Sequence, residues 1–134
     1  MSIKALNKIL NDTVALIRLT RKGIEYSLFH SIVLATPYNI KEWGTFLHLT
    51  ERTLQRYKKE NKTFDQPYSE KILAIVQLQN RGKEVFGQED HFNQWLDSNI
   101  VSLGGIKPKE LLDTTMGISL INQELVRIEH GVLA

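Results

Sequence analysis

Apolar residues recur along this chain at intervals of three and four, and runs in which apolar and polar residues alternate are nearly absent. The first spacing follows one face of an α-helix, whereas alternation would indicate strands. Only three prolines and eight glycines interrupt the 134 residues. The pattern predicts an all-α fold, with helices over residues 3–10, 13–22, 25–35, 40–48, 51–60, 70–86, 89–97, 108–113 and 115–130.

The composition excludes several classes of protein. There is no cysteine, so the chain forms no disulfide and no cysteine-ligated zinc site. No apolar run approaches the ~18 residues that a membrane span requires. The N-terminal segment MSIKALNKILNDTVAL carries acidic and amide residues within its apolar pattern, so it does not read as a signal peptide. We therefore expect a cytoplasmic protein with no membrane partner.

The net charge of +2 conceals two halves of opposite sign. Residues 1–62 hold 11 Lys/Arg and 5 Asp/Glu, a net charge of +6, whereas residues 63–134 hold 6 and 10, a net charge of −4. A basic half suits a polyanion and an acidic half a different partner, although two ordinary solvated surfaces explain the charges equally well. The polar, turn-rich stretch 61–69 is the best boundary, so we predict one domain over 1–62 and another over 69–134.

Residues 40–60 carry the framework of a helix-turn-helix motif. Its members are a small residue at the helix crossing, two apolar residues around the turn, a hydroxyl cap and an apolar anchor, which are Gly44, Leu47, Leu49, Thr50 and Leu54. The turn usually holds a glycine at positive φ, and His48, one of the few other residue types enriched there, takes that position. Upstream, Asn39 and Glu42 have the spacing of a capping box. This framework favours DNA binding.

The second helix of the motif presents a basic face. With Leu54 directed inward, a 100° helical wheel places Arg52, Arg56 and Lys59 on the opposite side, flanked by Gln55. Arginine can read guanine and glutamine can read adenine in the major groove, whereas lysines suit phosphates. The predicted DNA-binding residues are Thr50, Arg52, Thr53, Gln55, Arg56, Lys58, Lys59 and Lys62. A solvated basic helix is the alternative. One such module gives weak specificity, so we expect a homodimer that reads two half-sites.

The sequence predicts no catalytic site. No two histidines have the i, i+4 spacing of a metal site on one helix face, and Glu89-Asp90-His91 is better explained as an acidic helix N-terminus. The motifs GxxxxGK[ST], GxGxxG and GxSxG do not occur. We therefore expect no enzyme activity, cofactor or metal.

The second half of the chain allows a more specific comparison. Three segments carry it: LTERTLQRYKKENKTF, SEKILAIVQLQNRGKEVFG and FNQWLDSNIVSLGGIKPKELLDTTMGISLINQELVRIEHGVLA. The most specific pieces are Trp95-Leu96, Leu103-Gly104-Gly105, Pro108, Leu111-Leu112-Asp113-Thr114 and Arg127-Ile128-Glu129-His130-Gly131. These residues resemble the Xre-type antitoxins of RES–Xre toxin–antitoxin systems, in which a helix-turn-helix precedes the MbcA/ParS/Xre toxin-binding domain. The resemblance covers about residues 40–134, and the first 35 residues match loosely.

The resemblance implies a homodimeric antitoxin that binds a RES-domain toxin encoded by the adjacent gene, covers the NAD pocket of that toxin, and binds operator DNA. NAD chemistry would belong to the toxin, so no nucleotide site is implied on this chain. The residues that the resemblance assigns to toxin contact are Arg127, Glu129, His130, Gly131, Val132 and Leu133.

Two alternatives remain open. The apolar end, Val132 and Leu133, could instead pack on Phe92 and Trp95 in the core of its own chain, and Arg127 and Glu129 could form an internal ion pair. The protein could also be a stand-alone helix-turn-helix regulator whose C-terminal domain dimerises or binds another protein. In either case we expect core positions at Leu111, Leu112, Ile121 and Leu125.

Overall fold

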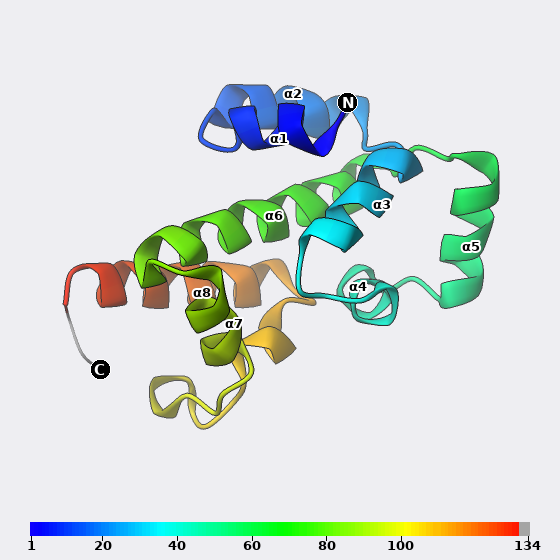
Figure 1. The fold of residues 1–134 in the computed structure, drawn as a ribbon. Helices are drawn as coiled ribbons and strands as arrows, with labels where there is room; N and C mark the ends of the chain where they lie inside the picture. Colours follow the sequence, from blue (N-terminus) through cyan, green and yellow to red (C-terminus); the bar gives the residue numbers. More distant parts are fainter. Residues whose placement is uncertain (132–134) are drawn as a thin grey trace. The chain divides into compact units, whose positions relative to one another are not determined.

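The computed structural model describes residues 1–131, which form eight α-helices and two short 3-10 helices (Figure 1). Extended pairing in this part of the chain is limited to the isolated bridges Glu25–Thr63 and Ile100–Ile106. The helices are α1 (Ile3–Ile9), α2 (Thr13–Lys22), α3 (Tyr26–Ala35), α4 (Ile40–Leu47), α5 (Glu51–Glu60), α6 (Gln66–Phe86), α7 (Glu89–Leu96), η1 (Val101–Leu103), η2 (Pro108–Leu111) and α8 (Thr115–Glu129). The all-α prediction is confirmed. None of the described helices is both long enough and apolar enough to span a bilayer.

The described residues form two compact units, one over residues 1–77 and one that begins at residue 78, so α6 contributes residues to both. The sequence placed the boundary before residue 69, but this stretch belongs to the first unit. Phe64 is 1% exposed, and the buried Ser69 hydroxyl donates to the Phe64 carbonyl oxygen at 3.0 Å. The same hydroxyl accepts the amide hydrogen of Ile24 at 3.0 Å. The polar stretch 61–69 is therefore part of the first unit and not a linker between two domains.

Helix α6 begins at Gln66, four residues earlier than the sequence indicated. Ser69 was expected to cap the helix, and instead it lies within the first turn, where its amide donates to the Asp65 carbonyl oxygen at 3.0 Å. Pro67 is compatible with this start because the first turn of a helix needs no amide donor from that position.

An aromatic cluster forms the core of the first unit. The ring of Phe29, fully buried on α3, lies 5.6 Å from that of Trp43 on α4 and 5.0 Å from that of Phe64, between centroids. Tyr57 of α5 lies 4.9 Å from Phe64 by the same measure. Such rings bury large apolar areas and interact through their edges and faces. The cluster therefore holds α3, α4 and α5 together.

The second unit has its own core on α7 and α8. The predicted core residues Leu112, Ile121 and Leu125 are fully buried, whereas Leu111 is partly exposed. The helix expected over 108–113 is the 3-10 helix η2. It packs closely on α8 because Gly117 has no side chain, and a Cβ there would overlap the Leu111 carbonyl group.

Candidate functional site

The turn between α4 and α5 has the geometry that the sequence predicted. His48 adopts φ +56° and ψ +39°, the left-handed conformation in which a glycine usually ends a helix. At the start of α4, the Asn39 side chain accepts from the Glu42 amide at 2.8 Å, and the Glu42 carboxylate accepts from the Asn39 amide at 3.1 Å. Both local predictions are therefore confirmed.

Gly44 lets the turn approach α4. A Cβ at this position would lie 2.8 Å from the Leu49 carbonyl oxygen and 3.6 Å from the Cδ1 atom of Leu54. The first distance is shorter than van der Waals contact, so only glycine fits without movement of the backbone. Leu54 itself is 1% exposed, as expected for the residue that anchors α5.

Two of the predicted DNA-binding residues, Thr50 and Thr53, form the N-terminal cap of α5. The Thr50 hydroxyl oxygen accepts from the Thr53 amide at 3.1 Å, and the two hydroxyl groups are hydrogen bonded at 3.0 Å. Capping by Thr50 is therefore confirmed. These bonds fix both side chains at the N-terminus of the helix, where the peptide dipoles favour an anion such as a phosphate.

The basic residues predicted to bind DNA are all exposed, but they lie on more than one side of α5. Arg52, Arg56 and Lys59 follow the side opposite the buried Leu54 and Tyr57. The ammonium group of Lys62 lies 4.7 Å from the ring centroid of Tyr57 and the guanidinium of Arg56 lies 5.9 Å from it. Six exposed polar side chains thus remain available for a polyanion: Arg52, Gln55, Arg56, Lys58, Lys59 and Lys62.

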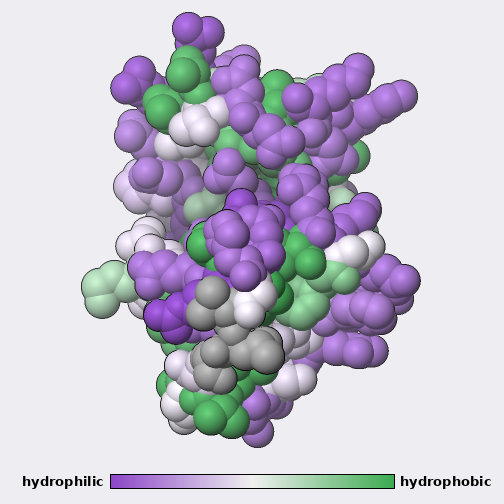
Figure 2. All heavy atoms as spheres, turned by 90° about the vertical axis from the view of Figure 1, so that its left-hand side faces the viewer, coloured by the Kyte–Doolittle hydropathy of each residue, from purple (hydrophilic) through white to green (hydrophobic). Residues whose placement is uncertain are grey.

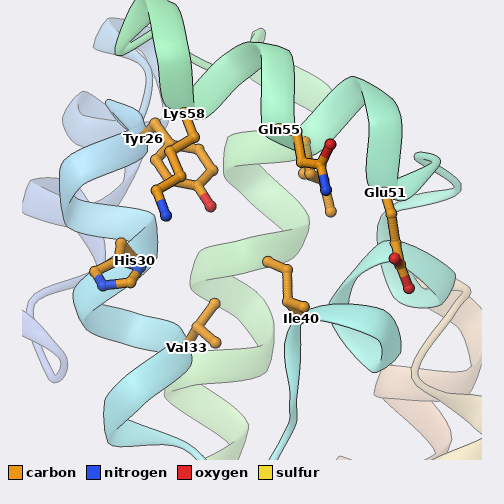
Figure 3. Close-up of a pocket in the computed structure, with 8 residues that line it drawn as sticks. Tyr26, His30, Val33, Ile40, Glu51, Gln55 and Lys58 are labelled. Carbon is orange, nitrogen blue, oxygen red and sulfur yellow. The ribbon is translucent and has the colours of Figure 1, made fainter.

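Gln55 and Lys58 also line a pocket of about 280 Å³ that the sequence analysis missed (Figure 3). The opposite wall comes from Tyr26, His30 and Val33 of α3, so the pocket exists only because α3 packs beside α5. Tyr26 is 7% exposed, and its burial raises the pKa of its phenol above the usual 10.0. No local pattern in the sequence indicated this pocket.

At the C-terminal end of α8, two of the residues assigned to toxin contact are held by ion pairs within the second unit. Arg127 lies 3.2 Å from the Glu124 carboxylate, and Glu129 lies 3.4 Å from the guanidinium of Arg81. The side chains of Arg127 and Glu129 remain 53% and 48% exposed. The two residues are thus paired with others and not with each other, and both stay accessible.

Glu124 is a buried carboxylate that the sequence analysis did not identify. It is 5% exposed, and in addition to its pair with Arg127 it accepts a hydrogen bond from the Ser102 hydroxyl at 3.1 Å. Because Ser102 belongs to η1, this bond links α8 to η1. The glutamate therefore holds η1 against α8.

The last described residues close α8. The His130 amide donates to the Val126 carbonyl oxygen at 3.1 Å, and the Gly131 amide donates to that of Ile128 at 3.1 Å, with Gly131 at φ +70°. Val132 and Leu133, the remaining residues assigned to toxin contact, lie outside the described residues. Their role, in a toxin or in the core of this chain, stays a prediction.

The second unit also carries exposed apolar side chains. Val101 on η1 is 92% exposed, Ile106 is 41% exposed and Met116 at the start of α8 is 81% exposed. Figure 2 shows apolar residues, in green, at the surface among polar ones. Residues 1–131 contain no group of three or more His, Asp or Glu side chains that could hold a metal ion.

Comparisons with known proteins assign a family to both halves of the chain. The model of the antitoxin Xre-like helix-turn-helix domain matches residues 15–77, and that of the antitoxin Xre/MbcA/ParS C-terminal toxin-binding domain matches residues 81–131. The first match begins well before the motif and ends where the first compact unit ends. Thus most of the N-terminal helices, which resembled the family loosely, belong to the matched domain.

Individual relatives support the same family. A Prs ADP-ribosylating antitoxin of Sphingobium sp. is 25% identical over 123 residues, which cover 85% of this chain and 77% of the relative. An antitoxin Xre of Photorhabdus laumondii is 27% identical over 104 residues, which cover 71% of this chain and 70% of the relative. An antitoxin Xre of Yersinia enterocolitica is 28% identical over 87 residues, which cover 64% of this chain and 59% of the relative.

Proposed function

This chain belongs to the Xre family of antitoxins, and on that premise we propose that it neutralises a RES-domain toxin by binding it directly and covering its active site. The observation that carries the proposal is the order of the two matched domains, a helix-turn-helix domain followed by a toxin-binding domain. The toxin would be the product of the adjacent gene. This chain would perform no chemistry.

The toxin-binding surface would be the C-terminal end of α8 and the residues after it. The matched toxin-binding domain includes Arg127, Glu129, His130 and Gly131. All four residues are exposed, although Arg127 and Glu129 form ion pairs. We assign toxin contact to these four residues together with Val132 and Leu133. The name of the Sphingobium relative refers to ADP-ribosylation. The name supports a toxin that uses NAD. The acidic second half of this chain would enter the NAD pocket of that toxin.

The first unit would bind operator DNA and so regulate the operon. Arg52, Gln55 and Arg56 would read base edges, while the lysines of α5 and Lys62 would neutralise phosphates. A homodimer would place two such helices on two half-sites. Both activities would take place in the cytoplasm, where operator and toxin are found.

A growth assay in a heterologous bacterium tests the proposal. The adjacent gene is induced alone and then together with this one. We expect growth arrest that this protein relieves, and co-purification of the two proteins. Absence of arrest, or arrest that this chain does not relieve, would contradict the antitoxin function and favour a regulator that acts on DNA alone.

A truncation then tests the assigned contact region. Deletion of residues 131–134 leaves all of α8 (Thr115–Glu129) and the buried side chains of α7 and α8 in the chain. The truncated chain should keep the helical circular dichroism and the oligomeric state of the full chain but no longer protect. A control replaces the exposed Val14 by Ser and should protect fully. Full protection by the truncated chain would disprove occlusion by the C-terminal residues.

A further inference from the structure

Neither proposed activity explains the pocket between α3 and α5, although Gln55 and Lys58, which line it, are among the proposed DNA contacts. Arg52, Arg56 and Lys59 follow the other side of α5, and the toxin-binding residues belong to the second unit. The volume of about 280 Å³ lies close to the lower limit of ~300 Å³ for small-molecule sites. A molecule with one or two rings, or a branched aliphatic chain, would fill it.

The walls of the pocket are largely apolar. Val33 of α3, Ile40 at the start of α4 and Leu54 of α5 line it, together with the ring of Tyr26. These side chains come from three helices that the aromatic core fixes relative to one another. The pocket is thus preformed within the first unit, which lowers the cost of ordering it around a ligand.

The polar side chains of the pocket are distributed unevenly. Figure 3 shows Lys58, the Tyr26 hydroxyl and His30 at one end, and Glu51 at the other. The ring of His30 stacks on that of Tyr26, with centroids 6.4 Å apart. Within residues 1–131, Lys58 forms no ion pair. An ammonium group without a partner, beside a hydroxyl donor, favours a negatively charged group at this end.

We propose that this pocket binds a small organic carboxylate with an aromatic or branched aliphatic body. The carboxylate pairs with Lys58 and accepts a hydrogen bond from the Tyr26 hydroxyl, while the body lies against Val33, Ile40 and Leu54. Glu51 repels an anion from the opposite end and so sets the orientation. The Tyr26 phenol is protonated near neutral pH and can donate, and burial raises its pKa further above the usual 10.0.

Occupation of the pocket has a consequence for DNA binding. Lys58 cannot neutralise a phosphate while it pairs with a bound carboxylate, so the ligand lowers the affinity for DNA. This consequence rests on the proposed DNA-binding function, whereas the ligand site itself does not.

The test is a titration of the full chain, followed by amide NMR spectra, with 2-naphthoate as the anionic probe and 2-naphthylmethylamine as its cationic counterpart. We expect saturable shifts around His30, Val33 and Lys58, and about tenfold tighter binding of the carboxylate, which corresponds to ~1.4 kcal/mol. Equal affinity for the two probes, or shifts confined to other parts of the chain, would overturn the proposal.

Two matched variants test whether the carboxylate binds at Lys58. Lys58→Met should weaken 2-naphthoate binding about tenfold, whereas Lys59→Met, one residue further along the same exposed helix, should change it less than about twofold. Val33→Trp fills the pocket and should abolish binding. The spectra of each variant report whether the fold is retained. Equal losses in the two lysine variants would refute the assigned site. Anisotropy with labelled DNA is measured separately, so failure of DNA binding leaves the ligand result intact.

Discussion

Substitution of Gly44 by Ala sets two effects of opposite sign against each other. In a helix interior, alanine is favoured over glycine by about 1 kcal/mol. At this position, however, the new Cβ would lie 2.8 Å from the Leu49 carbonyl oxygen. That oxygen belongs to the turn backbone, and the Leu49 amide is held by a 2.9 Å bond to the Gly44 carbonyl oxygen, so the turn cannot move away independently.

The unfavourable contact between the new Cβ and the Leu49 carbonyl oxygen should cost more free energy than the gain in helix propensity returns. Overpacking in a closely packed region costs about 1–3 kcal/mol. We therefore expect Gly44→Ala to lower the free energy of unfolding of the first unit by about 0–2 kcal/mol, and Gly44→Val, which adds bulk without the propensity gain, to lower it further. DNA affinity should fall as well, because the displaced turn sets the position of α5.

The assay is urea unfolding followed by tryptophan emission. Trp43 is fully buried in the first unit and Trp95 lies in the second, so a Trp95→Phe background reports the first unit alone. Thr45→Ala, on the exposed side of the same helix, is the control and should leave the urea midpoint nearly unchanged. A higher midpoint for Gly44→Ala than for the parent would refute the steric argument.

Three further predictions concern the first unit. Arg56→Ala should weaken specific DNA binding by about 1–3 kcal/mol in an anisotropy assay, whereas removal of the exposed Glu60 charge should not weaken it. Ser69→Ala should lower the free energy of unfolding by about 1–3 kcal/mol, measured by urea unfolding, because the Ile24 amide loses its acceptor. The raised pKa of Tyr26 means that the unfolded chain loses this proton first as pH rises. The contribution of Tyr26 to stability should therefore be constant well below pH 10 and fall above it. The parent should lose more stability above pH 10 than Tyr26→Phe; equal pH dependence of the two would contradict the assignment.

The sequence determined the features that depend on neighbouring residues. The Asn39–Glu42 capping box, the Thr50 cap and the left-handed His48 all follow from interactions three or four residues apart, and the structure confirms each of them. Most helix positions are confirmed as well, apart from the start of α6 and the 3-10 form of η2. The helix-turn-helix was predictable for the same reason. The resemblance to Xre antitoxins also rested on local motifs, and the family models bear it out.

Only the tertiary structure decided the features that join distant residues. The residues next to Ser69 predicted a helix cap, but Ser69 is buried and its hydroxyl accepts from the amide of Ile24, 45 positions away. The sequence analysis did not single out Glu124, which is 5% exposed and accepts a hydrogen bond from Ser102, 22 positions away. The pocket beside α5 requires α3 to pack against it. Such contacts depend on which helix faces meet, and helical periodicity identifies an apolar face without identifying what covers it.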